Sequence, residues 1–380
     1  MNTPAAHRPL LRLAQLEVLR VLAMTGVFLF HLWSVLPFDA TSGAFGLVLG
    51  RVFSFGYLGV VVFNIVTGFV LALPYLGPEP RRVPPYGDFL RRRFLRICPP
   101  YYLALLLWTA TALLTACGHR GSFVLTFVTH ALFLHTLHPA TFFGIVPAYW
   151  WLGLLAQFYL LFPLVLRLFL RLGPGWSGLG LCGICWLGSG LLARLAALQP
   201  DTPWAMINYL AYFNLPARLP EFVIGMWLAA AWNPSLPSGS GRVPVTPRRV
   251  PLAPSFAVFV LGMLLFVILG SWLLPLADTP LWHLYLVAWC VVGVVVLFLW
   301  SPVARLGTSR MVTSVAAASY SIYLVHQPLL DCGHQWLAGR LSLPAEFGLL
   351  LVGRIFPPPF SWISLKAKGL GHFSHYDVVM

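Results

Sequence analysis

Long apolar stretches recur along the chain, and they constrain its fold more than any other feature of the sequence. Each is about 20 residues long, enough for a helix to cross about 30 Å of hydrocarbon. Hydrophobic residues make up 59% of the 380 residues and charged residues only 9%, which is far from the composition of a soluble domain. Because the stretches do not alternate between apolar and polar residues, a transmembrane β-barrel is disfavoured. The sequence therefore predicts an all-α fold, a polytopic bundle of membrane helices.

Ten of these stretches are expected to be transmembrane helices. They cover residues 16–37, 54–75, 98–117, 148–170, 178–198, 212–232, 254–275, 281–300, 312–332 and 341–357. The segment near 121–147 is also apolar, but it contains several histidines and prolines. We expect it to be a re-entrant or interfacial segment, because irregular backbone at membrane depth is tolerated only where protein or water shields it.

The arginines between the stretches set the expected orientation. If segment 121–147 does not cross the bilayer, 15 arginines fall on one side and five lie at or near the other. The positive-inside rule assigns the richer side to the cytoplasm. The formal net charge of +14 is then explained by orientation, and we expect lipid rather than nucleic acid as a partner. The predicted location is the cell (inner) membrane, with both termini cytoplasmic.

One membrane domain is expected over residues 1–357, followed by a C-terminal tail over 358–380. The tail is neither clearly apolar nor periodic, so we expect it to be poorly ordered. The Pro/Gly/Ser-rich stretch 233–253 is predicted to be a cytoplasmic linker within the membrane domain.

The first predicted span carries three ionisable residues, Glu17, Arg20 and His31. The eleven-residue step from Arg20 to His31 is about three helical turns, so both side chains share one face, roughly 16 Å apart along the axis. Glu17 lies three residues before Arg20 and can pair with it. Such a stripe is expected to face a bundle interior or a wet cavity. A structural Glu–Arg pair with a buried histidine explains it equally well.

The Arg-X10-His pattern formed by Arg20 and His31, with Glu17 before it, resembles the signature of acyltransferase family 3, the integral membrane O-acyltransferases of carbohydrates. Four further stretches are similar to the family's motifs and occur in the same order. They are FGYLGVVVFNIVTGFVLALP (55–74), FLRRRFLRICPPYYL (89–103), ARLPEFVIGMWLA (217–229) and SYSIYLVHQPLL (319–330). The resemblance runs from about residue 14 to 333 and implies a ten-span core.

The stretch WWLGLLAQFYLLFP (150–163) departs from the family. The family often has Trp-Ser-Leu-X-X-Glu-X-Gln-Phe-Tyr there, and this chain keeps the Trp and the Gln-Phe-Tyr. Leu155 occupies the position of the glutamate, and its neighbour is Ala156. Whatever that acid does in other members is not done by residue 155 here.

Three residues of the stripe are suited to acyl transfer. His31 has the ordinary pKa range of a general base for the acceptor hydroxyl, or it can carry the acyl group transiently. Arg20 can orient His31, stabilise the oxyanion or bind the donor. Glu17 would offset the charge of Arg20.

Arg92, Arg93 and Arg96 are candidates for donor binding. They lie in the loop expected before the third span, at its cytoplasmic mouth, and guanidinium groups bind phosphates well. Acyl-CoA, with acetyl-CoA as the expected form, is predicted as a co-substrate, with no tightly bound cofactor. Topology control and lipid headgroup binding are the alternatives.

Further polar residues within the spans are candidates for lining a shared cavity, although hydrogen bonding between helices explains each of them as well. They are Asn64, Gln157, Tyr159, Tyr323 and His326. No metal site is predicted, because no carboxylate accompanies the histidines of segment 121–147.

These observations predict an integral membrane O-acyltransferase. It would move an acetyl or other short acyl group from cytoplasmic acyl-CoA to a hydroxyl of a cell-envelope or exported glycan or glycolipid. A transporter or flippase of such a glycan would also use a polar stripe, and a non-catalytic subunit of a polysaccharide assembly complex is a third reading.

Overall fold

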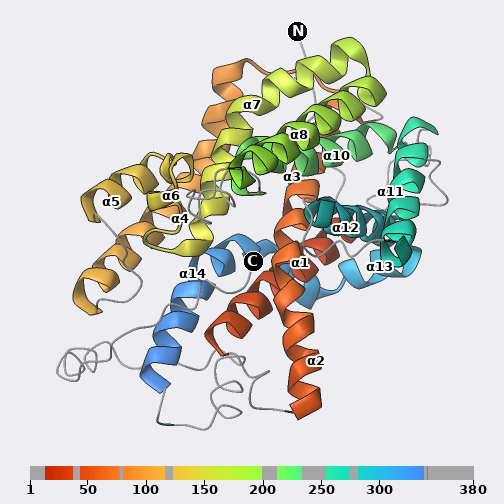
Figure 1. Cartoon of the computed structure of the whole chain (residues 1–380). Helices are drawn as coiled ribbons and strands as arrows, with labels where there is room; N and C mark the ends of the chain where they lie inside the picture. Colours follow the sequence, from red (N-terminus) through yellow and green to blue (C-terminus); the bar gives the residue numbers. More distant parts are fainter. Residues whose placement is uncertain are drawn as a thin grey trace.

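The computed structural model describes residues 13–36, 43–77, 80–115, 123–198, 212–232, 254–273, 281–337 and 340. The described residues form helices and no strands (Figure 1). Within the described residues, five helical stretches are long and apolar enough to cross a membrane. They are Ala14–Val35, Val48–Leu76, Tyr86–Leu114, Pro147–Leu172 and Pro174–Leu195. Shorter apolar helices cover Pro254–Leu269 and His283–Leu299. The predicted all-α, polytopic membrane fold is confirmed.

Helices coincide with the first nine predicted spans. The main helices are α1 (Ala14–Val35), α2 (Gly43–Ser54), α3 (Gly59–Leu76), α4 (Tyr86–Thr115), α7 (Trp150–Leu172), α8 (Pro174–Ala197), α10 (Leu215–Ala231), α11 (Pro254–Leu273), α12 (Leu281–Leu299), α13 (Ser301–Gly307) and α14 (Arg310–Leu337). The tenth predicted span (341–357), the linker 233–253 and the tail 358–380 lie outside the described residues.

Residues 123–149, the described part of the segment between α4 and α7, form only short elements. They are α5 (Phe123–Ala131), η3 (His135–Leu137), α6 (Pro139–Phe142) and η4 (Pro147–Tyr149). None of the candidate membrane spans lies in 123–146. This geometry agrees with the expected re-entrant or interfacial segment, whose side of the membrane stays a prediction.

Helix α4 differs from the expected third span, because it begins at Tyr86 rather than near Cys98. The predicted loop that carries Arg92, Arg93 and Arg96 is therefore helical. The arginines and leucines of this run are good helix formers, so the helix extends beyond the apolar stretch. Pro99 and Pro100 lie inside it and free the carbonyls of Leu95 and Arg96, two exposed residues, whose carbonyls water or lipid headgroups can satisfy.

Helix α3 packs most extensively against α10, and two glycines allow this close approach. A Cβ on Gly68 would collide with the carbonyl of Phe222, and a Cβ on Gly225 would collide with the carbonyl of Ile65. Small residues at such crossings let membrane helices approach until their backbones touch. The α3–α10 pair is therefore a rigid part of the core.

Helix α1 packs against α3, α13 and α14, so that it lies near the centre of the bundle. In Figure 1, α4 to α6 lie on one side of α1 and α3, and α11 to α13 lie on the other. This arrangement brings α14, late in the chain, alongside α1 and α4.

Candidate functional site

The centre of the candidate site is a pair of histidines from α1 and α14. The ring centroids of His31 and His326 lie 5.0 Å apart. His31 is half-buried and His326 is buried. Nδ1 of His31 and Nε2 of His326 are both buried without a hydrogen-bond partner among the described residues. Buried polar atoms normally have partners, so these two nitrogens are candidates for contact with a bound molecule.

Contacts along one face of α14 hold His326 in place. Its Nδ1 lies 2.8 Å from the carbonyl oxygen of Tyr323, which makes Nδ1 the donor and leaves a lone pair on Nε2. The hydroxyl of Tyr323 donates to the carbonyl of Ala148. The side-chain carbonyl of Gln327 accepts from the amide of Ala148 at 2.6 Å. The segment before α7 is thereby fixed against α14 next to the histidines.

Arginines gather at a second place, at the start of α4 and α1. The predicted ion pair of Arg20 and Glu17 is present, with Nη1 and Oε2 3.7 Å apart. Arg96 lies near enough to Arg20 for their charges to repel each other, and Arg92 and Arg96 act in the same way on Arg93. The guanidinium carbon of Arg93 lies 5.5 Å from the ring centroid of Phe89. Like charges kept close together favour an anionic ligand.

The two places lie at successive levels along α14. The hydroxyl of Tyr320 donates to the carbonyl of Ile97, next to Arg96, at 2.9 Å. His326 follows six residues later on the same helix, roughly 9 Å further along the axis. The arginines and the histidine pair are therefore separated along the bundle instead of forming one cluster.

The five cavity candidates take part in several different contacts between helices. Tyr323 and His326 lie beside His31. Tyr159 packs against Phe89 near the arginines. Gln157 donates to the hydroxyl of Thr136 at 2.6 Å, and Asn64 belongs to a network described next. Positions along separate helices do not reveal which neighbour each face meets, and packing divided these residues among several contacts.

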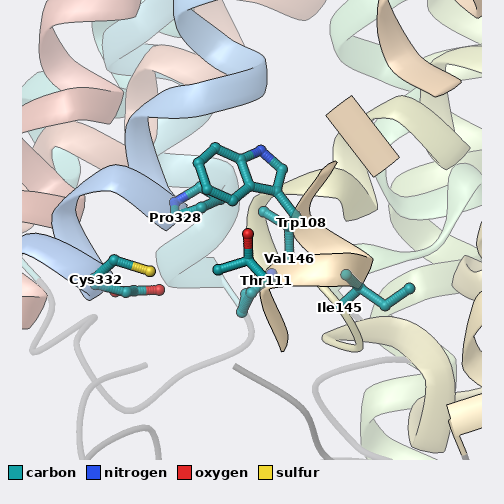
Figure 2. A pocket seen from close by; sticks show the side chains of 8 residues that line it. Trp108, Thr111, Ile145, Val146, Pro328 and Cys332 are labelled. Atoms are coloured by element: carbon teal, nitrogen blue, oxygen red, sulfur yellow. The ribbon is translucent and has the colours of Figure 1, made fainter. Parts of the chain in front are cut away.

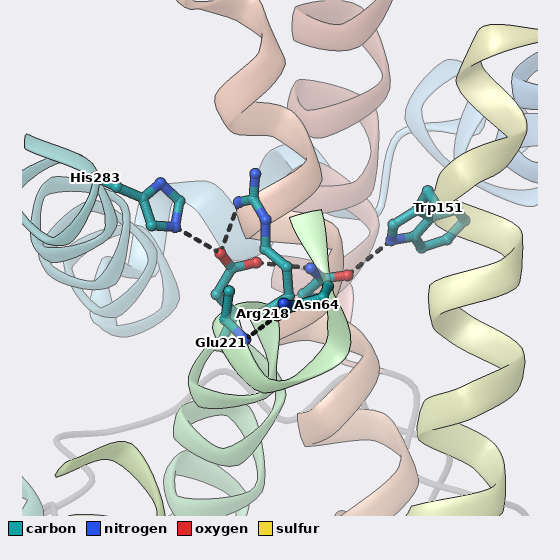
Figure 3. Close-up of polar contacts among 7 residues, drawn as sticks. Asn64, Trp151, Arg218, Glu221 and His283 are labelled. Carbon is teal, nitrogen blue, oxygen red and sulfur yellow. Dashed lines mark hydrogen bonds and ion pairs between the residues drawn. The ribbon is translucent and has the colours of Figure 1, made fainter. Parts of the chain in front are cut away.

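A buried polar network that the sequence reasoning missed joins four helices (Figure 3). Glu221 accepts from Arg218 at 2.9 Å and from Asn64 at 2.6 Å. Asn64 accepts in turn from the indole of Trp151 at 2.7 Å, and His283 lies 3.7 Å from Glu221. Arg218 and Glu221 have opposite charges and lie three residues apart in a predicted span. This pattern is the sequence feature that could have revealed the network.

This network reaches the histidine pair through an aromatic contact. The rings of Trp151 and Tyr323 have centroids 5.0 Å apart, and Tyr323 precedes His326 by one helical turn. Leu155, at the position of the family's usual glutamate, lies one turn after Trp151 and is buried. The carboxylate of Glu221, on α10, is therefore linked through Asn64 to the part of α7 where other family members often carry the glutamate.

A second pair of histidines lies in the segment between α4 and α7. The rings of His130 and His135 are stacked with centroids 4.0 Å apart, and both residues are fully buried. Burial lowers the pKa of His130 to about 3 and that of His135 to about 4. Among the described residues, no group of three histidines, cysteines or acids could hold a metal ion. The pair is neutral at pH 7.

Two curated relatives cover most of this chain. It is 25% identical over 373 residues to the acyltransferase MdmB of Streptomyces mycarofaciens, with 95% of this chain and 90% of the relative covered. It is 22% identical over 343 residues to "Putative O-acetyltransferase SACOL0978" of Staphylococcus aureus (strain COL). That match covers 84% of this chain but 51% of the relative, so the chain spans about half of the staphylococcal protein. No solved structure matches the chain.

A family comparison covers almost all of the described helices. The model of an acyltransferase domain matches residues 13–359, a range that includes the α1 stripe, the arginines of α4 and the histidine of α14. The chain therefore belongs to acyltransferase family 3 and is an integral membrane O-acyltransferase.

Proposed function

We propose that this enzyme transfers an acetyl or other short acyl group from cytoplasmic acyl-CoA to a hydroxyl of a cell-envelope or exported glycan or glycolipid. It would work in the cell membrane, with both termini in the cytoplasm and the arginine end of α4 facing the cytoplasm. The positive-inside rule supports this orientation, and the relatives named as acyltransferase and O-acetyltransferase support the reaction.

One observation carries the choice of donor, namely the separation between the arginines and the histidine pair. An acyl-CoA has its phosphates and its thioester at opposite ends of the long pantetheine arm. Arg93 and Arg96 can bind the phosphates through charge-assisted hydrogen bonds. The thioester would then reach His31, about three turns along α1 from Arg20. A donor without a long arm would not need two separated groups.

In this reaction His31 acts as the general base. The acceptor hydroxyl oxygen attacks the thioester carbonyl carbon while the imidazole of His31 takes the hydroxyl proton. The carbon–sulfur bond then breaks, the sulfur leaves with the bonding electrons, and the imidazolium returns the proton to it. The products are the acyl ester and free CoA thiol. His326, with a lone pair on Nε2, can accept a hydrogen bond from His31 and hold its ring in position.

The position of Arg20 favours one of its three expected roles. Helix α1 is continuous from Ala14 to Val35, which keeps Arg20 roughly 16 Å from His31 along the axis. This separation disfavours a direct contact of Arg20 with His31 or with an oxyanion beside it. Binding of the donor, together with Arg96, fits its place, and Glu17 offsets part of the charge.

The test compares envelope glycans from a host with the gene, without it, and with the His31→Gln variant. Mass spectrometry should show an acyl increment on a glycan only with the wild-type gene. Purified enzyme should transfer the label from radioactive acetyl-CoA to that glycan. An unchanged acyl profile together with altered glycan export would overturn the proposal in favour of a transporter.

A further inference from the structure

Pro328 interrupts the backbone hydrogen bonding of α14 two residues after His326. In an α-helix the amide of each residue donates to the carbonyl four residues earlier, so an amide at position 328 would donate to Leu324. Proline has no amide hydrogen, and the carbonyl of Leu324 therefore loses its usual donor. Because Leu324 is buried and buried carbonyls need partners, a donor from outside the helix has to replace the missing amide.

Two side chains from other elements donate to this carbonyl. The hydroxyl of Tyr149, in η4, lies 2.8 Å from the carbonyl oxygen of Leu324. The indole N–H of Trp108, in α4, lies 3.2 Å from the same oxygen, and Figure 2 shows the indole next to Pro328. Tyr149 is fully buried and makes the shorter bond. The turn of α14 that carries His326 is therefore completed by side chains from η4 and α4.

The element η4 holds the same turn of α14 at two further points. The hydroxyl of Tyr323 donates to the carbonyl of Ala148, and the amide of Ala148 donates to the side-chain carbonyl of Gln327 at 2.6 Å. Tyr323 comes three residues before His326, and Gln327 comes directly after it. Together with the bond from Tyr149, these contacts fix η4 to the turn on both sides of His326.

The backbone of this turn sets the orientation of the His326 ring. Nδ1 of His326 lies 2.8 Å from the carbonyl oxygen of Tyr323, which can only accept, so the ring hydrogen is on Nδ1 and the lone pair is on Nε2. The carbonyls of Tyr323 and Leu324 belong to successive peptide groups. A rotation of the backbone at Leu324 would therefore move the carbonyl that holds His326, whose ring lies 5.0 Å from that of His31.

Resting on the proposed acyl transfer, we infer that Tyr149 is a positioning residue for this reaction. Through Leu324, its hydroxyl holds the turn of α14 that orients His326, and His326 holds the ring of His31, the proposed base. Tyr149 itself contacts neither the substrates nor the reacting atoms. A displacement of about 1 Å in a catalytic group can lower a rate about 100-fold. Trp108 donates to the same carbonyl, which limits the loss when the hydroxyl of Tyr149 is removed.

The first test measures acyl transfer by Tyr149→Phe, which removes the hydroxyl and keeps the ring. With labelled acetyl-CoA and rates normalised to monodisperse protein, kcat should fall about tenfold. The KM for acetyl-CoA should not change, because the arginines proposed to bind the donor lie elsewhere along the bundle. In a His326→Gln background, the same change should lower kcat no further, because Tyr149 acts through His326.

Tyr101→Phe is the matched control. Tyr101 is as buried as Tyr149, and its hydroxyl also donates to a backbone carbonyl, that of His130, at 2.9 Å. Because this carbonyl is not in α14, Tyr101→Phe should leave kcat unchanged. An equal loss of kcat in both variants, or a further loss caused by Tyr149→Phe in the His326→Gln background, would mean that Tyr149 only stabilises the fold.

The second test needs no acyl transfer and uses NMR of the protein in detergent, labelled with ¹⁵N in its histidines. Nitrogen chemical shifts report which ring nitrogen carries the hydrogen, and the signals of His326 are those absent from His326→Gln. The wild type and Tyr101→Phe should show His326 with its hydrogen on Nδ1 alone. Tyr149→Phe should show a mixture of the Nδ1–H and Nε2–H forms.

Addition of Pro328→Ala to Tyr149→Phe should recover the single Nδ1–H form, because alanine restores an amide that can donate to Leu324. A single unchanged form of His326 in Tyr149→Phe would overturn the positioning role, and so would a mixture that persists after the addition of Pro328→Ala. The expected NMR changes in a protein whose wild type transfers no acyl group would count against the proposed reaction alone.

Discussion

The rings of His31 and His326 lie 5.0 Å apart in the bundle, although one belongs to the first described helix and the other to the last. Neither Nδ1 of His31 nor Nε2 of His326 has a partner among the described residues. The proposed base is thus paired with a second imidazole that lies deeper in the protein. We therefore expect the two residues to act as a unit.

Replacement of either histidine by glutamine should separate their roles. His31→Gln should lower acyl transfer by about 10²–10⁴-fold, the usual contribution of a general base, because an amide cannot take the proton. His326→Gln should cause a smaller loss, and the double variant should be no worse than His31→Gln alone, as for residues that act together. Rates are measured with labelled acetyl-CoA and normalised to monodisperse protein from gel filtration. Near-normal turnover by the well-folded His31→Gln variant would show that His31 is not the general base.

Removal of the Arg93 and Arg96 side chains should weaken the binding of the acyl donor without affecting the fold. Each charge-assisted hydrogen bond is worth about 1.5–3 kcal/mol, so Arg93→Ala with Arg96→Ala should raise the Kd of acyl-CoA by at least about a hundredfold. Calorimetry in detergent measures this change, and added salt should reduce the difference. Arg171→Ala, an exposed arginine in the last turn of α7, is the matched control. Unchanged binding of acyl-CoA would mean that the α4 arginines serve only to set the orientation of the protein in the membrane.

The Glu221 network should matter mainly for stability. Glu221→Gln leaves the guanidinium of Arg218 buried without its charge partner, which typically costs about 3–5 kcal/mol. Combining Glu221→Leu with Arg218→Met removes both charges and should recover much of the loss. Thermal unfolding in detergent, followed by tryptophan fluorescence, compares the variants. If the single variant melts like the wild type, the pair does not stabilise the α3–α10 core.

The α3–α10 crossing predicts a sharp difference between two glycines. Gly68→Ala should destabilise the protein by about 1–3 kcal/mol, the usual cost of overpacking, because its Cβ meets the carbonyl of Phe222. Gly183→Ala on α8 has nothing within 4 Å of the new Cβ and should be neutral or mildly stabilising, since alanine is the better helix former. Their melting temperatures, measured side by side, test the crossing; equal values would contradict it.

The stacked histidines predict acid sensitivity. Burial lowers the pKa of His130 to about 3 and that of His135 to about 4, so in the folded protein both stay neutral below the ordinary value of about 6.5. In that window the unfolded chain binds more protons, and stability must fall as the pH falls. The loss should begin near pH 6.5 and continue to about pH 3, the pKa of His130 in the folded protein. Replacing both residues by glutamine should flatten the melting temperature over this range, compared with the wild type at each pH.

The sequence by itself determined the all-α membrane architecture. The apolar stretches behind α1, α3 and α7 are local features, since the hydrophobic thickness of a bilayer sets how many consecutive apolar residues a span requires. The Glu17–Arg20 ion pair was predictable for the same reason, because residues three apart on a helix are always neighbours. The start of α4 was not predictable. The apolar stretch begins only near Cys98, whereas residues with high helix propensity extend the helix toward the N-terminus through the arginines.

Only the tertiary structure decided which polar residues meet. Asn64 was expected at a shared cavity with His326, but it bonds to Glu221 and Trp151, while His326 lies beside His31. The sequence gives each of these residues a face on its own helix and nothing about the helix that covers that face. That choice depends on how close the backbones approach, and here Gly68 and Gly225 let α3 and α10 touch. Helix packing couples every helix to the others at once, so the site emerges only when the whole bundle is assembled.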